Sequence, residues 1–518
     1  MPGGLVLALG AWGLGRQGSL WRDEAATWQV AHRSLPQIRR MLDHSDVVHG
    51  LYYALMHMVF DLFGDSLATL RLPSVLAMAV AAALTADLGA CLAGRWAGLG
   101  AGLAFALLPS VQEYAQEGRS YAMVTAYVAL TTRLLVAAAH RPRPGTWAAY
   151  AVVTLVAALL NWLSLLALLA HAVTLLLVRP PRAVWWRWLP AAGAATVGAL
   201  PLVLASRAQA GQVAWVRPAT WGTVCAVTAT VLLTCCLLLP VVAVRLPLGP
   251  GRGPVGRSGP AAVAIPLCAL PPVALLTVSL AVQPLYVSRY VLFTDIGLAL
   301  AIGALTAALG SRTALRPAFW LATVAAVAFL ALLPVEQQVR RADRRVDDVL
   351  AAAAMVAAER GPGDGVLFVP AARRDTALVS PEAFRGLDDV ALRRDAVESA
   401  TLHGVETGPA ATARALLRRH RVLLVGDELP RPVRGAGDRA KLRVLRTRFV
   451  LRSTTVSRGR RVSVYERSDR PARAVSGPRG HRLGASRRSR DAGRPSPRAQ
   501  RHAPVFAPPP AAARAGGP

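Results

Sequence analysis

The chain of 518 residues is 54% hydrophobic, above the ~45–50% of a typical soluble domain, and its mean hydropathy is +0.39. Its net charge of +30 comes from 59 basic and 29 acidic residues, and Lys441 is the only lysine. This charge does not indicate a nucleic-acid partner, because many arginines lie in short loops between apolar stretches or near the C-terminus.

Long apolar stretches that are almost free of charge follow one another up to residue 334. With their neighbours, most approach the ~20 residues that a helix needs to cross a bilayer. We therefore expect a mainly α-helical, polytopic transmembrane bundle with about eleven spans. The expected spans are residues 3–15, 72–92, 97–112, 120–138, 147–160, 163–178, 188–205, 221–243, 261–282, 290–310 and 317–334.

The composition changes after residue 334, which predicts three parts. They are a membrane domain at 1–334, a small α/β domain at 335–468 and a disordered tail at 469–518, rich in Arg, Pro, Ser, Gly and Ala. In the α/β domain the hydrophobic pattern predicts a helix over Asp343–Glu359, buried strands at Val366–Val369 and Val422–Val425, and an edge strand at Arg461–Tyr465.

Basic residues in short loops mark the cytoplasmic side of a membrane protein. Such loops lie at residues 141–144, 179–187, 245–257 and 312–316. The loop with Asp23 and Glu24, the segment 113–119 and the segment 289–290 then share the outer face, provided that residues 49–63 lie flat on the membrane. The Ala-, Gly-, Pro- and Arg-rich composition is typical of a GC-rich bacterial genome. We therefore expect a bacterial plasma-membrane protein with an extracytoplasmic site and C-terminal domain.

The first outer loop carries adjacent carboxylates, Asp23 and Glu24, close to an apolar stretch. Charges near lipid are costly unless they face water, a cation or a substrate. A transferase needs a carboxylate that accepts the proton of an acceptor hydroxyl, so we interpret the pair as catalytic. The alternative is a solvated loop with a helix cap. The following polar residues are candidate substrate ligands: Asp46, His49 and Tyr53.

Two further outer segments combine arginine with tyrosine. One contains Glu117, Arg119 and Tyr121, and the other contains Arg289 and Tyr290. A guanidinium binds a phosphate through two parallel hydrogen bonds, so both arginines are candidate phosphate ligands. The alternative is interfacial anchoring, with tyrosine rings at headgroup depth and arginines reaching to water.

No cofactor or metal is expected from the sequence. The chain has no Walker A motif, no H-E-x-x-H motif and no G-x-S-x-G motif. A metal site formed by His44, Asp46 and His49 is conceivable, but their spacing matches no common metal motif.

The first outer loop and the segments around Arg119 and Arg289, taken in chain order, resemble the GT-C superfamily of polytopic glycosyltransferases. Among them, the chain looks most similar to bacterial members grouped with the protein O-mannosyltransferases (glycosyltransferase family 39) and the lipid A aminoarabinose transferases. The resemblance covers residues 10–470 and rests on Trp21-Arg22-Asp23-Glu24, His49-Gly50-Leu51-Tyr52-Tyr53, Leu62-Phe63-Gly64-Asp65-Ser66, Leu70-Arg71-Leu72-Pro73-Ser74, the run from Tyr114 to Tyr121, and Ser288-Arg289-Tyr290.

Two departures from the family pattern leave the acceptor open. Members often have His-Pro-Pro-Leu where this chain has His49-Gly50-Leu51, and many have Ala-Arg-Pro-Tyr where it has Gly118-Arg119-Ser120-Tyr121.

The resemblance implies a polyprenyl-phosphate-linked, mannose-like sugar as donor and transfer to an acceptor hydroxyl on the extracytoplasmic face. It makes Asp23 the expected general base, with Glu24 as its neighbour or as an acceptor-orienting group. Arg119 and Arg289 would stabilise the leaving phosphate in a single, inverting displacement. The partners are then the lipid-linked donor, an unidentified acceptor and membrane lipid.

Two rival functions stay open. A transporter or flippase of lipid-linked sugars would account for the spans and the arginines, but transport pathways place ionisable groups near the midplane of the membrane. A membrane-anchored binding protein that uses the 335–468 domain would leave the many spans unexplained.

Overall fold

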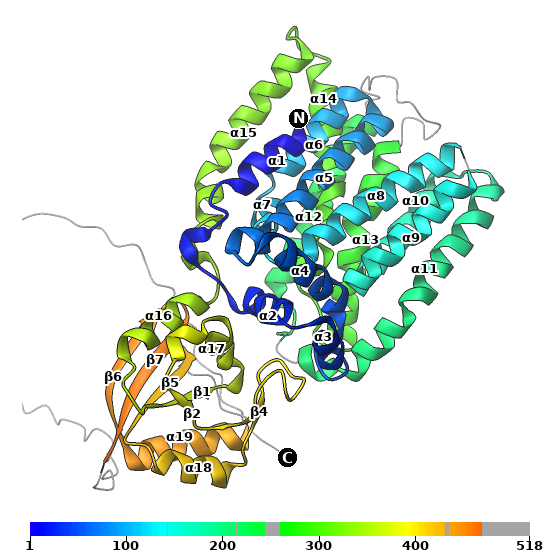
Figure 1. The fold of residues 1–518 in the computed structure, drawn as a ribbon. Coiled ribbons are helices and arrows are strands. Elements are labelled where there is room, and N and C mark those ends of the chain that lie inside the picture. The colour runs from blue at the N-terminus through cyan, green and yellow to red at the C-terminus, as the bar shows by residue number, and fades with distance from the viewer. Residues whose placement is uncertain (142, 214–215, 244–258, 430–434, 469–518) are drawn as a thin grey trace, which may run out of the picture. The chain divides into compact units, whose positions relative to one another are not determined.

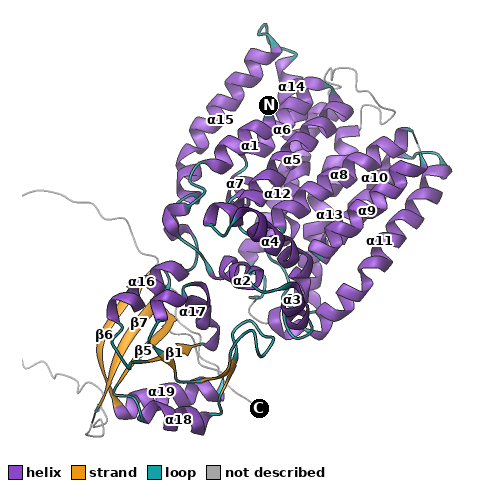
Figure 2. Ribbon diagram, viewed as in Figure 1, coloured by secondary structure: helices purple, strands orange, loops and turns teal. Residues whose placement is uncertain are grey.

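The computed structural model of the chain describes residues 1–141, 143–213, 216–243, 259–429 and 435–468. The predicted tail at 469–518 and the basic loop at 245–257 lie outside the described residues. The described residues belong to one compact unit that combines a helical bundle with an α/β domain (Figures 1 and 2).

Fifteen α-helices make up the described part of the bundle. They are α1 (Pro2–Ala11), α2 (Arg22–Ala31), α3 (Leu35–Leu42), α4 (Gly50–Phe63), α5 (Leu67–Ala93), α6 (Arg95–Leu107), α7 (Pro109–Ala115), α8 (Tyr121–His140), α9 (Pro144–Leu160), α10 (Ala167–Val178), α11 (Arg182–Ala208), α12 (Trp221–Ala243), α13 (Gly259–Ala281), α14 (Asp295–Gly310) and α15 (Pro317–Val339). The 3₁₀ turns that bear on the site are η1 (Arg16–Gly18), η2 (Val47–His49) and η5 (Ser288–Thr294).

Seven of the described helical segments are long and apolar enough to cross a membrane, so the chain is a multi-pass membrane protein. They are Leu67–Ala93, Tyr121–His140, Arg182–Ala208, Trp221–Val242, Gly259–Ala281, Ser288–Gly310 and Pro317–Val339. The other four expected spans fall on shorter helices, so the count of eleven stays a prediction. One of them, 97–112, is divided into α6 and α7, because Leu108 takes the extended conformation that a following proline favours.

The segment expected to lie flat on the membrane forms α4, a helix of 14 residues. At 1.5 Å per residue it is about 21 Å long, short of the ~30 Å hydrocarbon core. Tyr52 and Tyr53 are buried against the bundle, whereas Leu62 and Phe63 are exposed. This two-sided character suits an interfacial helix, and its orientation stays a prediction.

Glycines allow α5, α6 and α14 to pack closely. A Cβ atom at Gly98 would collide with the backbone of α5 at Ala86, and one at Gly303 would collide with the backbone of α6 at Ala101. Small residues at such crossings are typical of helix packing in membranes. The close packing fixes α14 beside α5 and α6 and thereby places η5, which precedes α14, against α8 and α13.

The α/β domain has a five-stranded sheet in the order β2-β1-β5-β7-β6. Strand β1 is parallel to β2 and β5, whereas β7 is antiparallel to β5 and β6; β3 and β4 form a separate pair. The elements are α16 (Val349–Glu359), β1 (Gly365–Val369), α17 (Asp375–Val379), β2 (Asp388–Asp389), β3 (Leu392–Arg394), β4 (Val405–Glu406), α18 (Pro409–Leu417), β5 (Arg421–Asp427), α19 (Ala436–Arg448), β6 (Phe449–Ser457) and β7 (Arg460–Arg467).

Helices cover both faces of this sheet (Figure 1). Val366 and Phe368 of β1 pack on one face with Val356 of α16, whereas Leu367 packs on the other with Leu445 of α19. Successive residues of a strand point to opposite faces, so a strand buried on both faces reads as the continuous apolar run seen in the sequence.

Two expectations for this domain were wrong. The strand at Arg461–Tyr465 is not an edge strand, because β7 pairs with β5 and also with β6, to which Arg458 and Gly459 connect it through left-handed backbone as in a type I′ turn. Strand β6 was not predicted from the sequence, because one of its faces is polar. The helix expected over Asp343–Glu359 begins only at Val349, because the side chain of Asp348 accepts hydrogen bonds from the first-turn amides.

The membrane domain was expected to end at residue 334, but α15 continues to Val339. The predicted division of the chain at this point stays a prediction.

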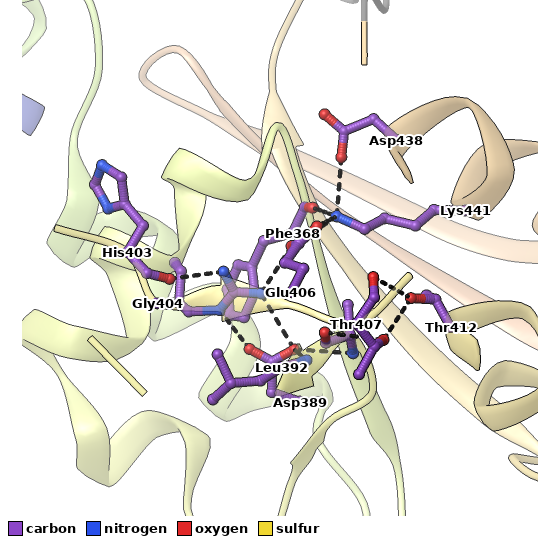
Figure 3. Close-up of polar contacts among 12 residues, drawn as sticks. Phe368, Asp389, Leu392, His403, Gly404, Glu406, Thr407, Thr412, Asp438 and Lys441 are labelled. Atoms are coloured by element: carbon purple, nitrogen blue, oxygen red, sulfur yellow. Dashed lines mark hydrogen bonds and ion pairs between the residues drawn. The ribbon is translucent and has the colours of Figure 1, made fainter. Parts of the chain in front are cut away.

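Lys441 lies at the centre of a buried polar network in the α/β domain and is 1% exposed. Its ammonium donates to the carbonyl oxygen of Phe368 at 3.0 Å and pairs with Glu406 at 2.7 Å and with Asp438 at 2.9 Å (Figure 3). Glu406 also pairs with Arg374 at 2.9 Å. The three donors of an ammonium suit three separate acceptors, whereas a guanidinium presents a planar fork. This geometry accounts for the lysine at position 441, whereas all the other Lys or Arg positions of the chain are arginine.

We expect Lys441→Met to lower the free energy of unfolding by about 3 kcal/mol, because it leaves Asp438 without its cation and removes one cation of Glu406. Denaturant titration of the full chain in detergent measures this change. The control is Arg443→Met at an exposed position of the same helix. Equal stability of the two variants would show that the Lys441 network contributes nothing.

Candidate functional site

The two carboxylates of the first loop lie in the first turn of α2, where the helix dipole favours negative charge. Adjacent residues of a helix are about 100° apart around its axis. Glu24 therefore points into the bundle and is 0% exposed, whereas the side chain of Asp23 is 22% exposed. Asp23 and Glu24 are neighbours in the sequence, but α2 directs their side chains into different environments.

Glu24 forms a buried, two-point ion pair with Arg71 of α5. Nε and one terminal nitrogen of Arg71 each lie 2.7 Å from a carboxylate oxygen, and the amide of Gly118 donates to the same carboxylate at 3.0 Å. Arg71 also donates to the carbonyl oxygens of Leu14 and Ser19, both at 2.7 Å. Burial raises the pKa of Glu24, but the Arg71 charge and its hydrogen bonds outweigh burial and hold this pKa at about 2. The pair is ionised at neutral pH and joins three segments.

Asp23 faces the other way and pairs with Arg289 of η5, 266 residues later, at 3.0 Å. The Arg289 guanidinium also lies 5.5 Å from the ring centres of both Trp21 and Tyr121 and 5.9 Å from that of Tyr290. These aromatic faces favour a cation beside them. A partly exposed carboxylate and a guanidinium therefore lie side by side against an aromatic wall.

Arg119 is directed mainly at His49. One terminal nitrogen lies 2.6 Å from Nε2 of His49, and the other donates to the carbonyl oxygen of Asp23 at 3.3 Å and to the hydroxyl of Thr27 at 3.4 Å. Since a guanidinium can only donate, Nε2 accepts and we assign the imidazole proton to Nδ1. Burial, then the Arg119 charge, lower the pKa of His49 to about 4, so the ring is neutral at pH 7.

Asp46 and Tyr53 lie beside His49. The hydroxyl of Tyr53 donates to Asp46, and the other oxygen of Asp46 lies 3.8 Å from Nε2 of His49. Burial raises the pKa of Asp46, but the charge of Arg119 and the hydrogen bond from Tyr53 oppose burial, and this pKa lies below its usual value. Within the described part of the chain, Nδ1 of His49 has no hydrogen-bond partner. The Nδ1–H of His49 is therefore a buried donor without a partner among the described residues.

Glu117 is buried, and one of its oxygens lies 2.6 Å from a terminal nitrogen of Arg345. Burial raises the pKa of Glu117 above its usual value, although Arg345 opposes this rise. The aromatic wall continues beside it, since the rings of Tyr114 and Tyr290 lie 6.1 and 6.0 Å from that of Tyr121.

The structure thus brings together all the residues that the sequence nominates. Sequence reasoning missed two others. Arg71 lies inside an apolar helix, which was a usable signal because a charge there needs a partner. Arg345 has no such signal, since it is one of several arginines in a polar linker.

A metal site was a weaker alternative at this place. Among the residues that the structure describes, no group of three or more His, Cys, Asp or Glu side chains could hold a metal ion. The expectation that no metal is needed stays a prediction.

Neither a family model nor a curated protein matches the sequence. The fold is similar to that of ArnT from Cupriavidus metallidurans bound to undecaprenyl phosphate, with 13% identity, 89% of this chain and 96% of that chain covered, and a TM-score of 0.54. A weaker likeness is to the archaeal oligosaccharyltransferase AglB from Archaeoglobus fulgidus in complex with an inhibitory peptide and a dolichol-phosphate, with 11% identity, 82% and 69% covered, and a TM-score of 0.45.

Of these two likenesses, the first alone has a TM-score above 0.5, and at 13% identity it shows a shared fold and not a shared activity. The expected GT-C fold is therefore confirmed. Membership of glycosyltransferase family 39 stays a prediction.

We expect Glu24→Gln to destabilise the protein by about 3–5 kcal/mol, because it leaves the Arg71 charge buried without a counter-ion. Asp23→Asn should cost about 1 kcal/mol, because its ion pair is partly exposed. Denaturant titration in detergent compares the two variants. Similar losses would contradict the division of the carboxylates into a buried and an open one.

The lowered pKa of His49 predicts a pH-dependent stability. Between the usual pKa of 6.5 and the folded value of about 4, the unfolded chain binds the proton more readily, so stability falls as the pH drops through this window. The shift corresponds to about 3 kcal/mol. Thermal unfolding between pH 7 and 4 should show a smaller decline for His49→Gln than for the wild type. His420→Gln, at an exposed position, is the control.

Proposed function

We propose that the chain is a membrane glycosyltransferase that moves a sugar from a polyprenyl-phosphate donor to an acceptor hydroxyl at the outer face of the membrane. The observation that carries the proposal is the ion pair of Asp23 and Arg289, which sets a partly exposed carboxylate beside a cation. The fold supports it, since the ArnT structure with the same fold contains undecaprenyl phosphate. A mannose-like sugar and a bacterial plasma membrane remain the expectations from the resemblance and the composition.

In the proposed reaction, Asp23 accepts the proton of the acceptor hydroxyl as its oxygen attacks the anomeric carbon. The bond from that carbon to the phosphate oxygen breaks, and the polyprenyl phosphate leaves with the bonding electrons. Arg289 then exchanges its contact with Asp23 for one with the phosphate and stabilises the developing charge. A single displacement of this kind inverts the anomeric configuration.

The contacts of Arg119 favour a role other than that of a second phosphate ligand. Both terminal nitrogens of Arg119 are engaged, by His49 and by the N-terminal turns of α2. We assign Arg119 the role of fixing the imidazole of His49 beside the first turn of α2. Its positive charge adds to the attraction for a phosphate. Asp46 and Tyr53 lie beside the same ring.

In this scheme Glu24 has a structural role and does not take part in the proton transfer. Arg71 and the amide of Gly118 occupy its carboxylate, which has no exposed surface. We therefore assign Glu24 the role of holding α2 against α5, and Asp23 that of the only base. At the edge of the aromatic wall, the partly exposed Tyr290, which packs on the buried Tyr121, offers the sugar ring a surface to pack on.

The rival function of a transporter or flippase is less well supported. Transport pathways place ionisable groups near the membrane midplane. Here the charged network gathers at the ends of helices and in the loop before α2. Among the described spans, Arg133 and Asp87 form an ion pair within two turns of the helix ends opposite those that carry the site.

Asp23→Asn should lower the rate of transfer by about 10²–10⁴-fold, the range that a general base contributes. Transfer from a synthetic polyprenyl-phosphate sugar in detergent measures this rate, and thermal unfolding confirms that the variant is folded. The control is Asp43→Asn, at an exposed position of the same loop. A folded Asp23→Asn variant with near wild-type turnover would exclude Asp23 as the base.

A further inference from the structure

The segment that leads into α16 connects the α/β domain to the start of α2, which carries Asp23. We call residues 345–349 the clasp; they run beside residues 20–22, which directly precede Asp23. Three hydrogen bonds join the two segments: the amide of Val349 donates to the carbonyl oxygen of Leu20 at 2.7 Å, the amide of Leu20 to Asp348 at 3.3 Å, and the amide of Arg22 to Asp347 at 3.2 Å.

The other side of the clasp is bound by the α/β domain. Asp347 pairs with the buried Arg460 of β7 at 2.9 Å, and Asp348 pairs with Arg458 at 2.7 Å. Arg460 also pairs with Asp375 of α17 at 2.8 Å. The clasp is therefore fixed on both sides by charge-assisted hydrogen bonds, which are stronger than neutral ones.

Arg345, the first residue of the clasp, reaches into the site. It lies 3.0 Å from Glu113 and 2.6 Å from Glu117, and its side chain is 9% exposed. Its guanidinium is 5.1 Å from the ring centre of Trp21, and the same ring lies 5.5 Å from the guanidinium of Arg289. Arg345 and the ion pair of Asp23 and Arg289 thus share one aromatic ring.

A cation beside Glu117 favours its charged form. Burial and the nearby negative charges of Asp23 and Glu24 disfavour its charged form, and Arg345 is the strongest opposing influence. The charged or titratable groups that face Glu117 are Arg345, Arg289, Arg16, Asp23, Glu24, Tyr52, Tyr114 and Tyr121. Among the described residues, Arg345 alone forms an ion pair with the Glu117 carboxylate.

We propose that Arg345 is a positioning residue of the transferase site, which anchors the Glu117 carboxylate as an anion near Arg289 and, through the clasp, makes the α/β domain part of the catalytic unit. This inference rests on the proposed function. An ionised Glu117 holds Arg289 at the place where the leaving phosphate needs a cation, because the guanidinium is attracted by Glu117 as well as by Asp23.

The test compares Arg345→Met with Arg344→Met in the full chain. Arg344 lies in the same linker, but it is 46% exposed and 3.5 Å from Glu113. Transfer from a polyprenyl-phosphate sugar is measured from pH 4.5 to 9. Arg345→Met should lower kcat/KM about 10–100-fold, the scale of a small misplacement in a site, and move the acid limb of the pH profile to higher pH. Arg344→Met should match the wild type.

Two further variants separate the role of Arg345 in the site from a role in folding. Arg345→Lys keeps the positive charge, so the acid limb should return toward its wild-type position even if kcat/KM does not recover. In the double variant Arg345→Met/Glu117→Gln the titrating carboxylate is absent, so the acid limb should not move relative to Glu117→Gln.

The inference is overturned if a folded Arg345→Met variant keeps the wild-type pH profile, or if Arg344→Met shows the same loss. Should Arg345→Met not fold, an acid limb displaced in Arg345→Lys would overturn it, whereas an unmoved limb would support it. If the wild type transfers no sugar from any polyprenyl-phosphate donor, the proposed function fails instead. That outcome is distinct, because it is seen before any variant is compared.

Discussion

The buried ion pair of Glu24 and Arg71 is the contact on which the site depends. Two charges without exposure are costly to bury, so the pair stabilises the fold only in its two-point, hydrogen-bonded geometry. This geometry joins α2, α5, the Gly118 turn and the carbonyl groups of Leu14 and Ser19. Since α2 then has one rotation about its axis, Asp23, about 100° away from Glu24, is directed at Arg289. The open carboxylate is a consequence of the buried one.

The rest of the site consists of charges placed at the ends of helices and in linkers. Asp23 meets Arg289 from η5, and Arg119 from the segment before α8 meets His49 from the segment before α4. Membrane spans can carry little charge themselves, so polar groups that act together must gather where the spans end. The charged groups of the site therefore come from several helix ends and linkers and not from the middle of one span.

The α/β domain, by contrast, carries charged side chains inside its core. A buried charge is tolerated there only when it has oppositely charged or hydrogen-bonding partners. Lys441 and Arg460 are buried, and each is surrounded by carboxylates or carbonyl groups. The same chemistry extends through Asp347 and Asp348 to the loop before Asp23. The domain is therefore joined to the bundle by specific charged contacts in addition to its covalent linker.

The sequence by itself determined the membrane bundle, the α/β domain and the three segments that meet at the site, because apolar length, strand periodicity and loop charge are local properties. It did not determine which carboxylate is buried, that β7 lies inside the sheet, or that Arg119 is directed at His49. Nor did it distinguish Arg345 from its neighbouring arginines. These features depend on partners far apart in the sequence, such as Asp23 and Arg289, which are 266 residues apart, and on the rotation of α2. Only the packed tertiary structure decides between such partners, since a single helix allows either carboxylate to face the core.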